Sequence, residues 1–169
     1  MANNIVLYHP AIPQNTGNIM RTCVATNSVL HLIKPLGFSL DDKSMKRAGL
    51  DYIQNLEWHV YENWEDFVSK NPGEYYFTTR YSKLTYTDFD FSDTKKNHYI
   101  VFGHEHDGID HDILKQHLDR CMRIPMAANA RSLNLSNCVA LVLYEAIRQQ
   151  DFEGLSRVEV QKGENFIYE

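Results

Sequence analysis

The sequence predicts an α/β fold, a mostly parallel sheet flanked by helices. Short apolar runs, such as residues 4–8, 29–34 and 99–102, alternate along the chain with segments whose apolar residues recur at helical spacing. This alternation is typical of parallel sheets, in which each crossover carries a helix. The length of 169 residues and the hydrophobic fraction of 43% allow one domain with a sizeable core. We find no repeat and no linker, so we expect a single domain over residues 1–169, with a short polar tail at 151–169.

The first half of the chain contains four of the expected strands. They lie at residues 4–8, 29–34, 57–61 and 75–80, all rich in apolar, aromatic or β-branched side chains. Helix starts are indicated by polar residues that can accept hydrogen bonds from free amides. The expected caps are Asn15 before Ile19–Val24, Asp41 or Asp42 before a short basic helix ending at Gly49, and Asn63 before a helix stopped at residues 71–73.

The second half leads to one long apolar helix. After an irregular loop at 81–97 we expect a strand at 99–102, a helix capped by Asp110 and running through Leu118, and a strand at 121–124. A small-residue loop, a polar turn at 131–134 and a helix to Gln150 that is apolar on almost every side then follow. Amides at a helix start lack intrahelical partners. The loop at 124–132 is therefore the expected wall of a cofactor site.

Charge and cysteine content restrict the class of protein. The net charge is -5, which by composition argues against a nucleic-acid binder. Residues 1–50 nevertheless carry five basic and two acidic residues, against twelve and twenty in the remainder, so we expect any phosphate contacts there. Cys23, Cys121 and Cys138 are widely spaced in apolar patterns and predict free thiols in a reducing cytoplasm. No signal peptide or membrane span is indicated.

Three loops at the carboxyl ends of strands could carry chemistry. They are Thr78-Thr79-Arg80, residues 103–108 and residues 124–132. The middle loop reads Gly-x-Glu-x-x-Gly rather than Gly-x-Gly-x-x-Gly, and no Walker lysine is present, which disfavours a nicotinamide or nucleoside-triphosphate enzyme. An ordinary strand-to-helix turn remains the alternative explanation. The His- and Asp-rich residues 104–112 resemble a metal cluster, but crowded flexible positions favour a solvated loop.

Two further features have both a structural and a functional interpretation. Arg21 follows the Asn15 turn in the basic third of the chain, and could either form a surface ion pair or contact a phosphate or ribose. Leu141 and Tyr144 on the long helix are better explained as core or dimer-interface residues than as site residues.

Three segments together resemble the motifs of the SPOUT-class RNA 2'-O-methyltransferases. They are NTGNIMR (15–21), IVFGHEHDG (100–108) and RIPMAANARSLNLSN (123–137), and LYHPAIPQNTGNIMRTC and PLGFSLDDKSMKRAGLDY are similar to the minimal, YibK-like branch. The resemblance covers nearly the whole chain. It implies an α/β SPOUT fold with a C-terminal trefoil knot, S-adenosylmethionine as the cofactor, a homodimer with a site shared across it, and no metal. It also implies tRNA as the substrate, methylated at cytidine or uridine of the anticodon wobble position.

The resemblance also assigns residues. It implies cofactor contacts from Phe77, Thr78, Gly103, Ile124, Met126, Ser132 and Leu133. It implies catalytic or site-building roles for Arg21, Asn15, Glu105, Ser132 and Asn134. Arg21 of one subunit is expected to act on the ribose hydroxyl while the other subunit holds the cofactor. The sequence departs from the family pattern at Asp107, where a basic residue is frequent, and at Asp110, where proline is frequent.

Three alternatives stay open at this point. A ribosomal RNA target would use the same chemistry, although the absence of an appended RNA-binding domain favours a compact tRNA target by analogy. A non-catalytic RNA-binding factor could retain the fold. A metal-dependent hydrolase could use the histidine-acid loop.

Overall fold

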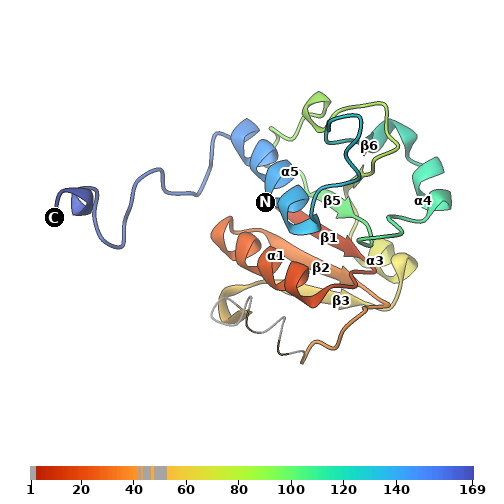
Figure 1. Ribbon diagram of the computed structural model, residues 1–169, viewed down its shortest axis with the longest axis horizontal. Coiled ribbons are helices and arrows are strands. Elements are labelled where there is room, and N and C mark those ends of the chain that lie inside the picture. Colours follow the sequence, from red (N-terminus) through yellow and green to blue (C-terminus); the bar gives the residue numbers. More distant parts are fainter. Residues whose placement is uncertain (1–2, 42, 44–46, 48–52) are drawn as a thin grey trace.

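A computed structural model describes residues 3–41, 43, 47 and 53–169, and Figure 1 shows the arrangement of their helices and strands. Six strands form one sheet in the order β3-β2-β1-β5-β4-β6, and every neighbouring pair is parallel. The strands are β1 Asn3–Tyr8, β2 Val29–Ile33, β3 Trp58–Tyr61, β4 Glu74–Thr78, β5 His98–Phe102 and β6 Cys121–Met122. The helices are α1 Pro13–Ala25, α3 Trp64–Lys70, α4 His111–Lys115 and α5 Leu135–Gln149, with 3-10 turns η1 Ile53–Asn55, η2 Tyr86–Asp88, η3 Leu118–Arg120 and η4 Phe166–Tyr168. The prediction of a parallel α/β sheet is confirmed.

The strands agree with the sequence patterns to within one residue except at two ends. β4 stops at Thr78 instead of residue 80, and β6 is only two residues long instead of four. Beyond the end of β6 the chain pairs with the irregular loop: the N–H of Arg123 donates to the carbonyl of Leu84 (2.8 Å), and the carbonyl of Arg123 accepts from the N–H of Tyr86 (3.0 Å). The backbone N–H and C=O groups of residue 123 thus form their hydrogen bonds with the loop at 81–97 instead of with β4.

The predicted N-cap of the first helix is wrong. α1 begins at Pro13, the cap position is Ile12 and makes no side-chain hydrogen bond, and Asn15 lies buried inside the first turn. Proline fits the first helical position because its fixed φ suits a helix and its missing N–H would have no partner there. The cap at Asn63 is confirmed, since its side chain accepts from the amide of Asp66 at 2.8 Å.

The remaining helices differ from the predictions at their ends. α4 is capped by Asp110 as expected but stops at Lys115, and the 3-10 turn η3 takes up the next residues before β6. The predicted basic helix after Asp41 lies outside the described residues. None of the described helices is long and apolar enough to cross a membrane.

Helices cover both faces of the sheet. α1 and α5 pack on one face, against side chains such as Ile5, Leu30 and Ile100, while α3 and α4 pack on the other, against Val6 and Val101. Alternate residues of one strand therefore enter different cores, and all of β1, β2 and β5 is buried, as expected for central parallel strands.

The long helix α5 buries only one side, although its sequence is apolar nearly all round. Five of its residues form the buried side: Val139, Val142, Leu143, Ala146 and Ile147. Leu141 and Tyr144 on the opposite side are 36% and 44% exposed. An apolar outer side on a helix at the edge of the core is a candidate contact surface.

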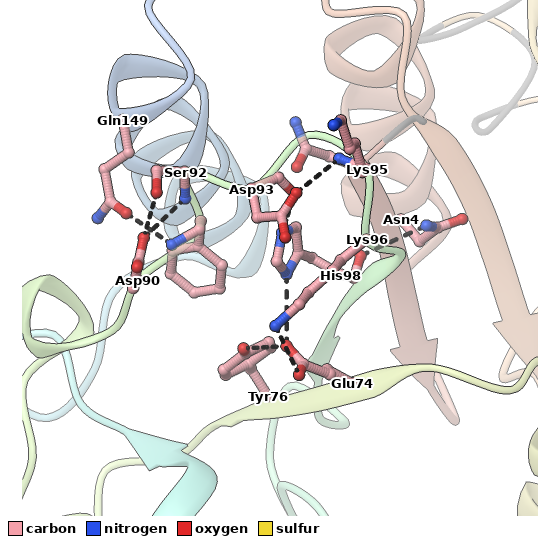
Figure 2. A network of polar contacts seen from close by, with 12 residues as sticks. Asn4, Glu74, Tyr76, Asp90, Ser92, Asp93, Lys95, Lys96, His98 and Gln149 are labelled. Atoms are coloured by element: carbon pink, nitrogen blue, oxygen red, sulfur yellow. Dashed lines mark hydrogen bonds and ion pairs between the residues drawn. The ribbon is translucent and has the colours of Figure 1, made fainter.

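The irregular loop at 81–97 is fastened at the amino-terminal edge of the sheet (Figure 2). The buried ring of His98 donates from Nε2 to the carbonyl of Asp93 at 2.9 Å, and Glu74 accepts from the Tyr76 hydroxyl at 2.9 Å. On the helix side, the amide of Gln149 accepts from the Phe91 N–H (2.6 Å) and donates to the Phe89 carbonyl (3.0 Å).

The end of α5 is also joined to the start of the chain. Asn3 and Gln150 exchange two side-chain hydrogen bonds of 2.9 Å, and Gln150 also donates to the carbonyl of Phe91 at 2.8 Å. Beyond this point residues 156–169 leave the body and are exposed (Figure 1), including Ile167 and Tyr168 at 81% and 85%.

Candidate active site

A cavity of about 410 Å³ lies at the carboxyl edge of the sheet. Its walls come from the loops after β4, β5 and β6 and from the starts of α1 and α5. Of the residues proposed from the sequence, it is lined by Asn15, Thr78, Gly103, Glu105, Ile124, Met126, Ser132, Leu133 and Asn134. The three loops singled out in the sequence therefore meet at one site, whose volume is in the range of small-molecule pockets.

Glu105 anchors the start of α1. Its carboxylate accepts hydrogen bonds from the amides of Ala11 and Ile12, both at 2.9 Å, and from the side-chain amide of Asn15 at 3.3 Å. Burial acts to raise the pKa of this carboxyl group, but the hydrogen bonds outweigh it and leave the pKa below its ordinary value. Glu105 is therefore an anion that satisfies the free amides of a helix start, and it is poorly suited to act as an acid.

Asn15 and Asn134 connect Glu105 through hydrogen bonds to the start of α5. The side-chain N–H of Asn134 donates to Oδ1 of Asn15 at 3.0 Å, while its own Oδ1 accepts from the amides of Ser136 (2.9 Å) and Asn137 (3.4 Å) and so caps α5. We call Glu105, Asn15 and Asn134 the carboxylate–amide chain. It fixes the starts of both helices relative to each other across the pocket.

The glycines of the middle loop close the loop on itself. A Cβ at Gly103 would lie 2.4 Å from the carbonyl carbon of Gly108, so only glycine allows the two backbones to touch there. Gly108 has a positive φ of 71°, which glycine adopts at little cost. The hydrogen bonds between His104 and Gly108, of 3.1 and 2.9 Å, complete this turn. The glycines of this loop thus allow close approach of the loop to itself.

The histidine-acid loop has a structural role for its first ring. Nδ1 of His104 accepts from the amides of His106 (3.0 Å) and Asp107 (3.1 Å). Within the described part of the chain, no group of three His, Cys, Asp or Glu side chains is placed to hold a metal ion.

The pocket residues fit an adenosine-containing cofactor. Ile124, Met126 and Leu133 give an apolar wall for an aromatic ring, and Ser132 adds a hydroxyl group. The buried Oγ1 of Thr78 has no hydrogen-bond partner among the described residues. Buried polar atoms are normally paired, so an orphaned hydroxyl in a pocket wall is a candidate ligand contact.

Two of the proposed residues do not line this pocket. Phe77 is fully buried on the other face of the sheet, where its ring stacks on His117 at 4.8 Å. Arg21 is exposed on α1, six residues after Asn15, and a helix turns about 240° over that distance, so the two side chains face different directions.

The pocket also contains residues that the sequence did not point to. Arg123 and Cys138 line it, and so does Tyr81, directly after the Thr78-Thr79-Arg80 loop. Extending that loop by one residue would have found Tyr81. Cys138 was masked by the apolar pattern of α5, and burial raises the pKa of its thiol, as it does for Cys23, whose pKa is raised to about 12.

The fold and the pocket define the class of α/β proteins that have a cavity of small-molecule size at the carboxyl ends of a parallel sheet. Comparison with known proteins supplies its family. Residues 2–144 match the SpoU rRNA Methylase family, and the chain belongs to this family of methyltransferases.

Relatives cover almost the whole chain. A Geobacillus stearothermophilus protein provisionally named a tRNA (cytidine(34)-2'-O)-methyltransferase is 52% identical over 157 residues, which are 92% of this chain and 100% of that protein. A Methylovorus glucosotrophus protein named tRNA (cytidine(34)-2'-O)-methyltransferase is 46% identical and covers 89% of this chain and 97% of its own.

Solved structures agree in fold. One that concerns 2-OH methylation of C/U34 on tRNA has a TM-score of 0.81 and 33% identity, covering 90% of this chain and 98% of its own. The SpoU methyltransferase AviRb of Streptomyces viridochromogenes in complex with AdoMet has a TM-score of 0.74 and 25% identity, covering 88% of this chain and 60% of its own.

Proposed function

We propose that this methyltransferase modifies the ribose 2'-hydroxyl of cytidine or uridine at position 34 of tRNA, using S-adenosylmethionine, in the cytoplasm. The observation that carries this proposal is the relative that aligns over its full length at 52% identity and is provisionally named for this activity. The pocket supports it, because its apolar wall and orphaned hydroxyl suit the adenosine of the cofactor. A ribosomal RNA target, which the family description mentions, is the alternative.

The bound cofactor would supply an activated methyl group, and the protein residues position the groups that react. Thr78 and Ser132 would hydrogen-bond the cofactor, and Ile124, Met126 and Leu133 would cover its ring. The carboxylate–amide chain would keep the two pocket walls at a fixed separation. We therefore assign Glu105, Asn15 and Asn134 as positioning residues and not as groups that exchange protons.

Arg21 is proposed to act in the pocket of a partner subunit. Helix geometry turns it away from its own pocket, and α1 and α5 lie side by side with Leu141 and Tyr144 exposed on α5 (Figure 1). A homodimer through these helices would cover the apolar side of α5 and carry Arg21 to the other site. A guanidinium stays protonated at neutral pH, so it would orient the hydroxyl and stabilise the developing alkoxide and would not act as a base.

The family resemblance also leads us to propose the trefoil knot. Residue 123 forms hydrogen bonds with residues 84 and 86 of the loop at 81–97, and Gln149 of α5 forms hydrogen bonds with residues 89 and 91 of the same loop. These contacts at both ends of the segment from β6 to α5 support the proposal, because a threaded segment would have to touch the loop that surrounds it.

The test is methyl transfer to defined RNAs. Purified protein, labelled S-adenosylmethionine and a tRNA transcript should give 2'-O-methylcytidine or 2'-O-methyluridine at position 34, detected by nuclease digestion and mass spectrometry. Arg21→Ala should lose transfer while calorimetry shows unchanged cofactor binding, and Arg157→Ala, an exposed arginine of the tail, is the matched control. Incorporation into ribosomal RNA alone would refute the tRNA assignment, and normal transfer by Arg21→Ala would refute its role.

A further inference from the structure

The pocket is lined by two arginines as well as by the acidic residues Glu105 and Asp107. Arg80 and Arg123 both line it, and neither forms an ion pair with any described residue. Arg123 uses one nitrogen, Nη1, to donate to the carbonyl of Arg80 at 2.7 Å, which places the two residues side by side. Most of the cations that do form ion pairs lie away from this pocket, as Lys34 does, which pairs with Glu62 at 2.9 Å. The carboxylate of Glu105 is held by the amides of Ala11 and Ile12, and that of Asp107 lies beside His104 at 3.7 Å, so neither carboxylate pairs with an arginine. The two guanidinium groups are therefore available to an anionic ligand.

An exposed aromatic ring lies beside these arginines. Tyr81 lines the same opening and is 71% exposed. The guanidinium carbon of Arg80 is 5.9 Å from the centre of its ring, and the ring of His111 meets it edge-on at 5.8 Å. Large aromatic side chains usually bury most of their surface. A ring held by neighbours at a pocket mouth, with most of its surface free, is suited to stack on a flat partner.

The exposure of Tyr81 argues against the cofactor as that partner. Pocket ligands of cofactor size bury most of their surface inside the cavity. The ring of Tyr81 is at the rim, where it would meet a larger molecule that stays partly outside. Arginine recognises phosphate with a planar fork of donors, and every nucleobase offers a face for stacking. The combination of unpaired arginines and a free ring therefore matches a single-stranded nucleotide.

We propose that Arg80, Tyr81 and Arg123 form a docking platform for one nucleotide that neighbours the methylated ribose. Its base stacks on Tyr81, and its phosphate is held by the two guanidinium groups. This inference rests on the proposed function for the identity of the RNA. Bases in single-stranded loops such as an anticodon are available for stacking, whereas paired bases are not. The platform places the phosphate contact at the pocket rim, in addition to the basic amino-terminal third that the charge distribution indicated.

The platform is tested by RNA binding, measured separately from catalysis. Fluorescence anisotropy with a labelled anticodon stem–loop RNA, in the presence of S-adenosylhomocysteine and at several salt concentrations, gives Kd and its salt dependence. Tyr81→Ala should weaken RNA binding about tenfold, while Tyr81→Phe, which keeps the ring, should bind within about twofold of the unchanged protein. Arg80→Ala should lower the slope of log K against log salt by about 0.7, the value for one phosphate contact on a single strand.

Two matched controls separate the platform from general effects. Tyr168→Ala removes another exposed tyrosine, 85% exposed in the tail, and Lys95→Ala removes a cation at the opposite edge of the sheet. Both should keep the RNA affinity and the salt slope. Calorimetry with S-adenosylhomocysteine should give the same affinity for all variants.

The outcomes distinguish this inference from the proposed function. If Tyr81→Ala binds RNA as tightly as the unchanged protein, or loses cofactor affinity instead, the platform is refuted even where position 34 is methylated. If the protein binds the stem–loop with the predicted dependence on Tyr81 but methylates another RNA, the platform stands and the tRNA assignment fails. Failure of the unchanged protein to bind RNA refutes the platform.

Discussion

Asn134 gives the most direct test of the carboxylate–amide chain, because its side chain makes two separable contacts. Its Oδ1 caps α5, and its N–H donates to the buried Oδ1 of Asn15 at 3.0 Å. Asn134→Ser keeps an oxygen for the cap but removes the N–H donor, whereas Asn134→Ala removes both.

The two contacts have different expected contributions. Loss of an asparagine cap costs about 1 kcal/mol, and a buried acceptor that loses its donor costs about 1–3 kcal/mol. We therefore expect Asn134→Ala to lower the free energy of unfolding by about 2–4 kcal/mol and Asn134→Ser by about 1–3 kcal/mol. For a chain of this length, about 1 kcal/mol corresponds to roughly 2–4 °C in Tm.

Urea unfolding and differential scanning calorimetry measure these changes. A third variant, Asn15→Ala, removes the acceptor, so that Asn134→Ser in this background should cost less than it does alone. No loss for Asn134→Ser would show that the contact with Asn15 contributes nothing, and equal losses for the two Asn134 variants would show that the cap contributes nothing. Additive losses in the double variant would show that the two side chains are not coupled, and the chain would then not be a connected unit.

Three further predictions concern the loops and the sheet. Gly103→Ala should cost about 1–3 kcal/mol and weaken cofactor binding in calorimetry, because its Cβ would meet the Gly108 backbone at 2.4 Å. Gly108→Ala, which meets no atom within 4 Å but has a positive φ of 71°, should cost about 1–2 kcal/mol, and equal cofactor affinity in both would contradict the role of the close contact. Burial, and then the nearby His59, lower the pKa of His31 to about 3. Unfolded histidine binds a proton below about pH 6.5 and the folded ring does not, so stability should fall by about 2 kcal/mol between about pH 7.5 and about pH 5. His31→Gln should show a correspondingly smaller loss in urea titrations. Gln149→Ala should speed hydrogen exchange of the Phe91 amide, which donates to Gln149 at 2.6 Å, and an unchanged rate would contradict that contact.

The strands were predictable because they are buried on both faces. The strands β1, β2 and β5 are buried along their whole length and mostly apolar, and no helix pattern competes with them. Element ends were less predictable where a tertiary contact decides them. β6 ends early because residue 123 pairs with the loop at 84–86, and that loop has no regular pattern of its own. The start of α1 could have been predicted from Pro13, because proline at the first helical position indicates a helix start more strongly than Asn15 does here.

The sequence indicated which loops form the site, but it did not indicate which residues form hydrogen bonds with one another there. Strand-end positions brought the three loops together, as the rule for parallel sheets requires. The bond from Glu105 to the amides of Ala11 and Ile12 spans more than 90 residues and leaves no local trace in the sequence. Phe77 was placed in the pocket by resemblance, but its neighbour Thr78 faces the cavity, since successive side chains of a strand point to opposite faces.

The paired side chains of Asn3 and Gln150 bear on how the protein is made. The first strand leaves the ribosome early, yet its partner on the end of α5 follows 147 residues later. Strand β5, which pairs with β1, is likewise absent until residue 98 and the residues after it have been synthesised. Nascent chains that stop before α5 therefore hold an incomplete central sheet with apolar strands uncovered. The central sheet of this protein can accordingly be completed only after nearly the whole chain has been translated.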